Sequence, residues 1–412
     1  MIRKLFLGLL GLATIAAAGF FIFAPAIVDA DMNAVDGKPL PEISEKARDL
    51  HASLTIIDLH SDTLLWKRDV LERHDYAHMD LPRLRDGNVA LQVFSSVTKT
   101  PKNQNYDSNS DDTDNVTLLV FGQLQPPRTW TSLLERSLYH AEKLQRAAAN
   151  SQGALQSISK DADLNALMLK REGAMATRLE GGPKPIGALF SAEGLHNLEG
   201  DLDNLDVLYD AGMRMAGLTH FFDNELAGSM HGTNKGGLTE MGRDAIRRME
   251  EMGMIVDIAH CSQQCVTEII AIARRPIVSS HGGVQATCNV NRNLSDEHIR
   301  GVAATGGIIG IGYWEGAVCD TSPEAIARAM KHVRDLVGIE HVALGSDFDG
   351  TVTVRFDTAG LVHVTQALMN AGFSEAEIRA AMGENAMRVI GEGLRPISQL
   401  DQVPKAEEDD AS

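Results

Sequence analysis

The sequence predicts an α/β fold and, within that class, a (β/α)8 TIM-like barrel of the metal-dependent hydrolase type. Short apolar runs rich in strand-forming residues alternate with amphipathic helical patterns along most of the chain. This alternation indicates parallel strands, because a parallel pair needs a crossover connection. Eight such runs occur, which is the number that closes this type of barrel, and at least six of them are followed within two residues by His, Asp or Glu.

Each predicted element follows from its apolar period and its flanking turn residues. The predicted strands are Leu54–Leu59, Val89–Val97, Ile186–Ser191, Met213–Thr219, Met254–Ala259, Pro276–Ser280, Gly307–Tyr313 and His341–Ser346. The predicted helices include Ser132–Ala149, Thr239–Met252, Gln264–Ala273, Asp296–Ala304, Pro323–Val337 and a helical region near Phe373–Ile390.

Residues 1–30 have the composition of a signal peptide or a membrane anchor. Arg3 and Lys4 precede an uncharged apolar run from Leu5 to Val28. The length of this run favours an anchor, because about 20 apolar residues span a bilayer. The small residues around Ala30 favour cleavage of a signal peptide. Both alternatives stay open, and both predict an exported, periplasmic or otherwise extracytoplasmic protein that contacts the membrane only through this segment, since the positive end stays in the cytoplasm.

The rest of the chain divides by composition. Residues 31–44 are polar and predict a linker, whereas residues 45–395 hold the predicted barrel. Residues 99–128 are polar and interrupt the alternation, which indicates a surface insertion, and the acidic residues 396–412 predict a disordered tail. The formal net charge of -18 argues against nucleic acid as a partner, because an acidic surface repels phosphates.

The ends of the predicted strands carry the side chains that bind zinc and related metals. In a (β/α)8 barrel the carboxyl ends of all strands meet at one face, where the active site lies. Residues far apart in sequence are therefore expected to converge there. The candidate site residues at these ends are His60, Asp62, Glu193, His220, His260, His281 and Asp347.

Five of these side chains are candidate metal ligands, which is more than one ion needs. A single catalytic zinc takes about three protein ligands and a water. Two ions about 3.5–4 Å apart share a bridging carboxylate and would use all five. The predicted ligands of two Zn²⁺ ions are His60, Asp62, Glu193, His260 and His281, with Glu193 as the bridge because its two oxygens can contact both ions.

At these residues the sequence resembles the membrane dipeptidase (renal dipeptidase) family of zinc peptidases, which have a distorted (β/α)8 barrel. The resemblance extends from about Thr55 to Ile390. It is strongest in Ser191–Gly194, Gly212–His220, Gly253–His260, Pro276–His281 and Gly345–Gly350. By this resemblance His60 and Asp62 match the ligands of one zinc, Glu193 matches the bridge, and His260 and His281 match the ligands of the second zinc.

The resemblance also implies the reaction and the residues around it. A hydroxide that bridges the two zinc ions attacks the peptide bond of a dipeptide, and family members often accept D-residues at the C-terminal position. His220 is similar to the histidine that stabilises the developing oxyanion, and Arg292 to the arginine that holds the substrate. Asp347 resembles the acid/base residue that passes a proton to the leaving amine. The resemblance further implies a homodimer.

The family pattern pairs two cysteines, which implies a disulfide between Cys288 and Cys319. Family members also carry a tyrosine near the substrate carboxylate, but neither Tyr313 nor Trp314 matches its register, so neither is assigned. The insertion at 99–128 has no match. Three further polar residues in nearby loops are interpreted as solvent-exposed: His196, Glu225 and His231.

Two other functions remain as alternatives. The first is a metal-dependent amidohydrolase that acts on another amide or a lactone, although such enzymes usually begin with His-x-His where this chain has His60 and Asp62. The second is a catalytically silent barrel tethered to the membrane. A silent barrel would be expected to have lost a ligand, whereas every proposed ligand is present.

Overall fold

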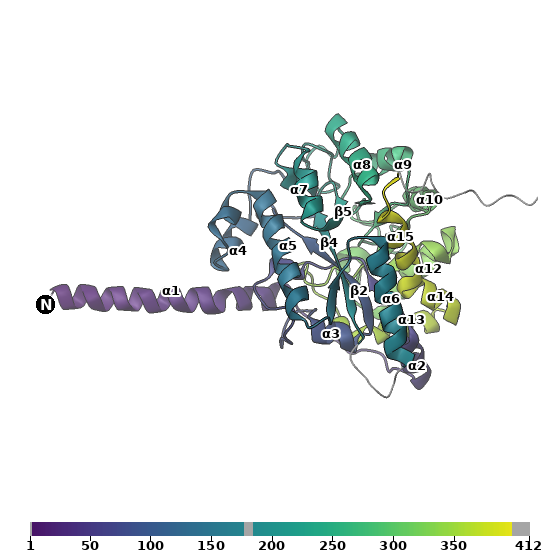
Figure 1. The fold of residues 1–412 in the computed structure, drawn as a ribbon, viewed down its shortest axis with the longest axis horizontal. Coiled ribbons are helices and arrows are strands. Elements are labelled where there is room, and N and C mark those ends of the chain that lie inside the picture. Colours follow the sequence, from purple (N-terminus) through teal and green to yellow (C-terminus); the bar gives the residue numbers. More distant parts are fainter. Residues whose placement is uncertain (1, 177–183, 398–412) are drawn as a thin grey trace, which may run out of the picture.

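The strands of the computed structural model, which describes residues 2–176 and 184–397, form a closed barrel surrounded by helices (Figure 1). Eight parallel strands lie in the order β2-β1-β9-β8-β7-β6-β5-β4, and pairing of β2 with β4 closes the barrel. The predicted TIM-like fold is thus confirmed. The strands are β1 Ile56–Asp58, β2 Val89–Ser96, β3 Leu155–Ser157, β4 Ile186–Glu193, β5 Met213–Gly217, β6 Ile255–Asp257, β7 Val278–Ser279, β8 Ile308–Ile311 and β9 Val342–Leu344.

Every predicted strand is present, most of them shorter than the apolar run that predicted them. The exception is β4, which extends two residues beyond its predicted end and finishes at Glu193. Strand β3 is not among the predicted strands; it lies outside the closed barrel and, within the described residues, pairs with β4 alone. Gln156 and Ser157 leave this strand half-exposed and polar, so it lacks the apolar run of a buried parallel strand.

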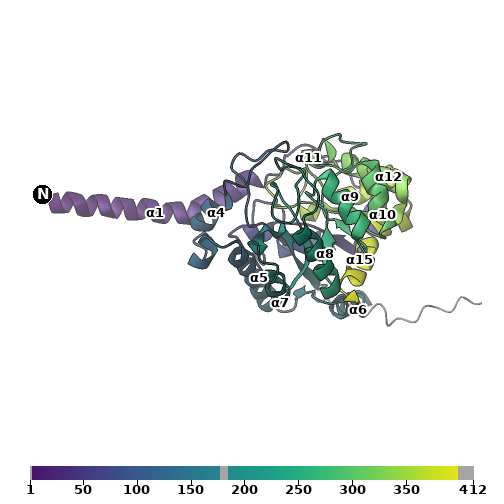
Figure 2. The same cartoon turned by 90° about the horizontal axis from the view of Figure 1, so that it is seen from above.

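Helices cover the outside of the barrel (Figures 1 and 2). Their starts follow local capping: Ser322 accepts a hydrogen bond from the backbone N–H of Ala325, and Pro323 occupies the first turn of α12. The helices are α1 Ile2–Met32, α2 Glu45–Ser53, α3 Leu81–Asp86, α4 Val116–Gly122, α5 Leu133–Asn150, α6 Asp161–Ala176, α7 Asn204–Asp210, α8 Glu240–Met252, α9 Gln263–Ile272, α10 Asp296–Ala304, α11 Glu315–Val318, α12 Pro323–Val337, α13 Val362–Asn370, α14 Glu375–Arg379 and α15 Asn385–Gly393.

The barrel interior is a packed core. Inward-facing residues such as Leu91, Leu189 and Met215 form one buried cluster with Val389 and Ile390 of α15. A second and larger cluster lies between the outer faces of the strands and the surrounding helices. The predicted C-terminal helical region is α14 and α15 joined by a π-helical turn, Ala380–Glu384. Side chains therefore fill the inside of the barrel, and a site can form only at the carboxyl ends of the strands.

Helix α1 extends from the body as a single rod, and its last turns lie against the barrel next to α4 (Figures 1 and 2). Over residues 2–176 and 184–397, no helix combines the length and the apolar character needed to cross a membrane. Residues 99–128, predicted as an insertion, run as a loop into α4 and a 3-10 turn at Pro127–Trp130. Most of the predicted tail, 398–412, falls outside the described residues.

Candidate metal centre and substrate cleft

The carboxyl ends of the barrel strands bring the predicted metal ligands together. His60 and Asp62 follow β1, Glu193 is the last residue of β4, and His260 and His281 follow β6 and β7. All five side chains are buried. Strand register aligns Glu193 with Gly217 of β5, and Gly217 with Asp257 of β6, so these ends stop at one level of the barrel.

Glu193 lies at the middle of the cluster and contacts both of its halves. One carboxylate oxygen, Oε1, lies 2.7 Å from Nε2 of His260 and 3.0 Å from Nε2 of His281. The other oxygen, Oε2, lies 3.7 Å from Nε2 of His60 and 3.4 Å from Nε2 of His220. The two oxygens thus face different sets of histidines, which is the arrangement that a bridging carboxylate needs.

The ligand atoms also form compact groups of the size that holds one ion. Within each of three groups, the nitrogen and oxygen atoms lie within 4.8 Å of one another. The groups are His60 with Asp62 and Glu193; Glu193 with His220 and His260; and His60 with His281 and Asp347. His60 and Glu193 each belong to two groups, so the groups are neighbours in one centre.

Several polar atoms of this centre are buried without a hydrogen-bond partner. They include Nε2 of His60 and Oδ1 of Asp62, which lie 3.4 Å apart. Leaving a buried polar atom unpaired costs about 1–3 kcal/mol. Imidazole nitrogens and carboxylate oxygens are ligands of zinc and related divalent metals, so bound cations would satisfy these atoms. The residues present therefore fit a centre of two divalent ions.

The pKa shifts in the cluster also indicate a site for divalent cations. Burial raises the pKa of Glu193 well above its usual range, and the carboxylate of Asp62 raises it further. Burial alone would lower the pKa of His60, but the carboxylates of Asp62 and Glu193 outweigh it and raise this pKa to about 10. Burial and Arg292 lower the pKa of His260 well below its usual range. A divalent cation offsets the cost of keeping these carboxylates ionised together.

Neighbouring side chains orient the ligands. Oγ of Ser280 donates to Oδ2 of Asp257 at 2.5 Å and lies 2.8 Å from Nδ1 of His281. With its hydrogen used on Asp257, Ser280 accepts the Nδ1–H of His281, which leaves Nε2 of that ring as the free ligand atom. Asp58 similarly accepts the backbone N–H of His60 at 3.1 Å. Nothing in the sequence marks Asp58 and Asp257 as site residues, because both lie inside predicted strands.

Asp347 and Asp349, which the sequence leaves easy to confuse, have different surroundings. Oδ1 of Asp347 lies 3.9 Å from Nε2 of His60, within the ligand cluster. Burial raises the pKa of Asp347 to about 8. Asp349 instead forms a buried ion pair with Arg68 and accepts the hydroxyl of Thr63 at 2.6 Å. The structure thus places Asp347, and not Asp349, against the metal ligands.

Two of these residues have unusual backbone conformations. His260 has φ of 65° and Asp347 has φ of 59°, both in the left-handed region that residues other than glycine rarely adopt. Gly194, directly after Glu193, has φ of 94°, and a Cβ there would press on the ring of His196. Such conformations cluster at functional sites, where the surrounding structure holds them.

Arg292 lies on the side of the centre formed by His260. Its Nη2 lies 3.3 Å from Nε2 of His260 and donates to the carbonyl oxygen of His281 at 3.1 Å. The guanidinium also lies over the ring of Trp314, 5.5 Å from the ring centroid. Nε1 of Trp314 donates to the hydroxyl of Tyr106 at 3.0 Å. Arg292, Trp314 and Tyr106 therefore form one wall of the cleft.

Tyr106 is a site residue that sequence analysis missed, because it lies in the unmatched insertion. The carbonyl oxygen of Tyr106 lies 3.0 Å from Nδ1 of His231, and the backbone N–H of Asn109 donates to the carbonyl of His231 at 2.8 Å. The insertion thus packs on the loop after β5. The interpretation of His196 and His231 as solvent-exposed is wrong, because both side chains are buried, whereas Glu225 is exposed. Tyr313 is buried against Phe348 and does not line the cleft.

The cleft above the metal ligands has a volume of about 830 Å³. Its floor includes Asp62, Glu193, His220, His260 and Asp347. Ligand sites of proteins are typically about 300–1,000 Å³, so this cleft has the size of a small-molecule site. Its walls come from three regions: the Arg292 and Trp314 side, the insertion with α4, and the last turns of α1.

Comparison with known proteins gives one consistent result. Residues 44–397 match the membrane dipeptidase family (peptidase family M19). The dipeptidase aclJ of Aspergillus oryzae is 27% identical over 361 residues, which cover 82% of this chain and 78% of the relative. The fold is similar to that of the probable dipeptidase PvdM of Pseudomonas aeruginosa, with a TM-score of 0.67, 18% identity, and coverage of 85% of this chain and 98% of that chain. It is also similar to a metallo peptidase of Rhodobacter sphaeroides bound to a phosphinate mimic of L-Ala-D-Ala, with a TM-score of 0.66, 20% identity, and coverage of 82% and 99%.

Proposed function

Because the chain belongs to the membrane dipeptidase family and is a metallo-dipeptidase, we propose that it hydrolyses dipeptides at a centre of two zinc ions bridged by Glu193. The observation that carries this proposal is the position of Glu193. One of its oxygens faces His260 and His281, and the other faces His60 and His220. His60 and Asp62 would hold one ion, and His260 and His281 the other.

The protein side chains bind and orient the substrate around these ions. When bound, the two ions lower the pKa of a shared water so that it can attack a peptide carbonyl near neutral pH. Arg292 binds the free carboxylate of a dipeptide, because a guanidinium pairs with a carboxylate through two parallel hydrogen bonds. His220, buried beside Glu193, donates to the carbonyl oxygen as negative charge develops on it.

Asp347 takes the proton that must reach the leaving amine. An amine leaves poorly unless it is protonated, so a positioned acid is required. The carboxyl group of Asp347 lies in the floor of the cleft beside His60, where it can exchange a proton with the attacking water and then with the amine nitrogen. Because Arg292 would bind a free carboxylate close to the scissile bond, the site favours substrates as short as two residues.

We further propose that a D-residue is accepted at the C-terminal position. Support comes from the Rhodobacter sphaeroides relative, which was solved with a mimic of L-Ala-D-Ala. Hydrolysis of L-Ala-D-Ala and L-Ala-L-Ala by the purified, zinc-loaded protein tests this point. A rate on L-Ala-D-Ala that does not exceed the metal-free background would refute it.

Metal analysis combined with a substrate panel tests the proposed function. We expect close to two zinc ions per chain by mass spectrometry and hydrolysis of dipeptides in preference to N-acyl amino acids and lactones. Faster cleavage of a lactone or an N-acyl amino acid would favour the alternative amidohydrolase. Absence of stoichiometric metal, with no hydrolysis after zinc is added, would favour a silent barrel.

We also propose that the barrel functions outside the cytoplasm as a homodimer. Arg3 and Lys4 before the apolar segment favour export of the rest of the chain, and a disulfide between Cys288 and Cys319 suits an oxidising compartment. An alkaline phosphatase fusion after residue 397 reports the compartment through its activity. Light scattering of the purified protein gives the mass, and a monomer at micromolar concentration would refute the dimer.

A further inference from the structure

The last turns of α1 form part of the wall of the active-site cleft. Phe20, Ala24, Pro25, Val28 and Met32 line the same cavity as the metal ligands. Pro25 is buried, and Val28 and Met32 are each more than half covered, at 39% and 38% exposure. Residues that are not directed at the cleft are much more exposed, such as Ile22 at 63% and Ile27 at 65%. One face of this helix thus packs over the cleft.

A buried ion pair fixes this part of α1 to the body. Asp29 is only 2% exposed, and its Oδ2 accepts from Nε of Arg68 at 2.9 Å. Its other oxygen accepts from Nδ2 of Asn33 at 2.8 Å. Arg68 also pairs with Asp349, two residues beyond Asp347. Removing one partner of a buried pair leaves an uncompensated charge, so this ion pair ties the end of α1 to the folded body.

The residues after Asp29 are attached to the same loop that holds Asp347. The backbone N–H of Thr351 donates to Oδ1 of Asn33 at 2.9 Å. Val35 forms a parallel bridge with Val354, and Nε of Arg355 lies 3.0 Å from Oδ2 of Asp36. The first residues of the predicted linker are therefore hydrogen-bonded and ion-paired to the loop that follows Asp347.

We propose that Ala24–Met32 is a permanent wall of the substrate cleft and selects dipeptides that have a large apolar N-terminal residue. The proposal rests on the proposed dipeptidase function. It implies that the mature protein keeps Asp29. A cut after Ala30, where the small residues would place it, removes Pro25, Val28 and Asp29 together.

The position of the wall decides which substrate residue it contacts. Arg292, which binds the substrate carboxylate, lies beside His260. The α1 segment is bonded through Asn33 to Thr351, next to Gly350, and a Cβ on Gly350 would lie 3.0 Å from Oδ2 of Asp62. The wall is thus on the Asp62 side of the centre, and Arg292 is on the His260 side. A dipeptide with its carboxylate on Arg292 directs its N-terminal side chain toward α1.

The other surfaces near this wall are also apolar. Leu65, Trp66, Val97, Val116 and Leu119 line the cleft beside α1. An apolar side chain that enters this space leaves water, which favours binding by roughly 25 cal/mol for each Å² covered. The cleft of about 830 Å³ has room for an aromatic side chain in addition to the dipeptide backbone. A dipeptide with glycine as its N-terminal residue would have no side chain to contact α1.

Two measurements test the proposal, the first on protein recovered from the exporting cell and the second on the full-length, zinc-loaded protein. The first is the N-terminal sequence of the mature protein recovered from the exporting cell, which we expect to begin before Asp29. The second is kcat/KM for L-Phe-L-Ala and Gly-L-Ala. We expect the parent to prefer Phe-Ala, and the double variant Val28→Ala/Met32→Ala to reduce that preference by about tenfold. The matched control Ile22→Ala/Ile27→Ala, on the uncovered face of the same helix, should keep the preference of the parent.

The outcomes separate this proposal from the proposed function. A mature N-terminus at Asp31 in a protein that still cleaves dipeptides would overturn the proposal alone. So would an unchanged preference in the Val28→Ala/Met32→Ala variant, provided that its melting temperature matches the parent. If the zinc-loaded parent cleaves neither dipeptide, the proposed function itself fails. If the Val28→Ala/Met32→Ala variant loses the preference for Phe-Ala and the Ile22→Ala/Ile27→Ala control keeps it, the proposed role of α1 in substrate selection is supported.

Discussion

Removing the disulfide between Cys288 and Cys319 should destabilise the barrel by an amount that its loop length sets. The structure confirms this pair, and the two cysteines are 31 residues apart in the sequence. In the chain-entropy description, a cross-link that closes a loop of this length stabilises the fold by about 3.5–4 kcal/mol. The double variant Cys288→Ala/Cys319→Ala loses that contribution, because its unfolded chain regains the freedom of the open loop.

The corresponding change in melting temperature depends on how many residues unfold together. Unfolding entropy is about 2.1 cal/mol/K per residue, so the family-matched region 44–397 unfolds with roughly 0.75 kcal/mol/K. A loss of about 3.5–4 kcal/mol then lowers the melting temperature by about 5 °C. Differential scanning calorimetry measures this shift. A double variant that melts within about 1 °C of the parent would refute the entropic reasoning.

A reductant provides an internal control. Cys261 and Cys265 are free and buried, so the double variant contains no disulfide among the described residues 2–176 and 184–397. Dithiothreitol should therefore lower the melting temperature of the parent and leave that of the double variant unchanged. A shift of similar size in both proteins would mean that the reductant acts elsewhere.

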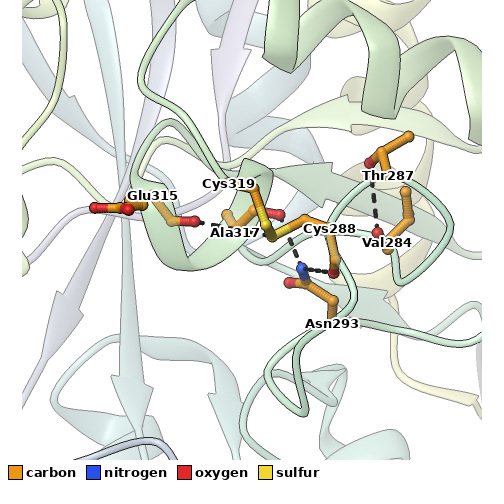
Figure 3. The surroundings of a disulfide bond; sticks show 7 residues. All are labelled: Val284, Thr287, Cys288, Asn293, Glu315, Ala317 and Cys319. Atoms are coloured by element: carbon orange, nitrogen blue, oxygen red, sulfur yellow. Dashed lines mark hydrogen bonds between the residues drawn. A yellow bond between two sulfur atoms is a disulfide. The ribbon is translucent and has the colours of Figure 1, made fainter.

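The same disulfide should affect substrate binding through the loop that it closes. Nδ2 of Asn293 donates to the carbonyl of Cys288 at 2.8 Å and to that of Ala317 at 2.9 Å, which joins the two sides of the loop (Figure 3). Arg292 directly precedes Asn293. If Arg292 binds the substrate carboxylate as proposed, it contacts it alike in the ground and transition states, so its displacement should raise KM more than it lowers kcat.

Three further predictions concern the site and the fold. Asp347→Asn should keep the fold and two metals per chain but lower kcat by about 10²–10⁴, because the proton can no longer be transferred; parent-like turnover would exclude this role. His260→Ala should lose one metal, measured by mass spectrometry, together with activity, since His281 and the shared Glu193 would be too few ligands to hold that ion, and full metal content would contradict the ligand assignment. Burial lowers the pKa of His51 to about 4, whereas its ordinary pKa is 6.5. Between pH 6.5 and about 4, His51 is therefore protonated in the unfolded state but neutral in the folded state. The free energy of unfolding, which has its full value above pH 6.5, falls by about 3 kcal/mol as the pH drops toward 4. Urea titrations at pH 7 and 4.5 should show a smaller loss for His51→Gln than for the parent, and equal losses would refute the assignment.

The parts of the fold that could be predicted share one physical origin. Parallel strands covered on both faces appear in the sequence as uninterrupted apolar runs, so all eight barrel strands were found. The candidate ligands could be predicted because each lies within three residues of the end of such a run, and barrel geometry brings the ends of the runs together. Glu193 shows this most simply: it lies two residues after the predicted run Ile186–Ser191 and ends β4.

The parts that could not be predicted depend on contacts between segments without an apolar period. Tyr106 enters the cleft from a polar loop, and its contacts with His231 and Trp314 explain its position. Asp257 lies within a predicted strand, and its bond to Ser280 depends on the neighbouring strand. Residues 31–44 have the polar composition of a linker, yet Asp36 pairs with Arg355, more than 300 residues away. In each case the partner is remote in sequence.

The loop after β9 links Asp347, the proposed proton-transfer residue, to the N-terminal helix. Asp347, Asp349 and Thr351 all have positive φ, at 59°, 65° and 60°. Conformations of this kind cost about 1 kcal/mol or more each, so contacts elsewhere must compensate for them. Each of the last two residues has such a contact: Asp349 pairs with Arg68 and accepts the backbone N–H of His78 at 2.8 Å, and Thr351 donates to Asn33. Because Arg68 and Asn33 also hold Asp29, the same interactions attach α1 to the loop that carries Asp347. The N-terminal helix and this loop are therefore stabilised as one unit.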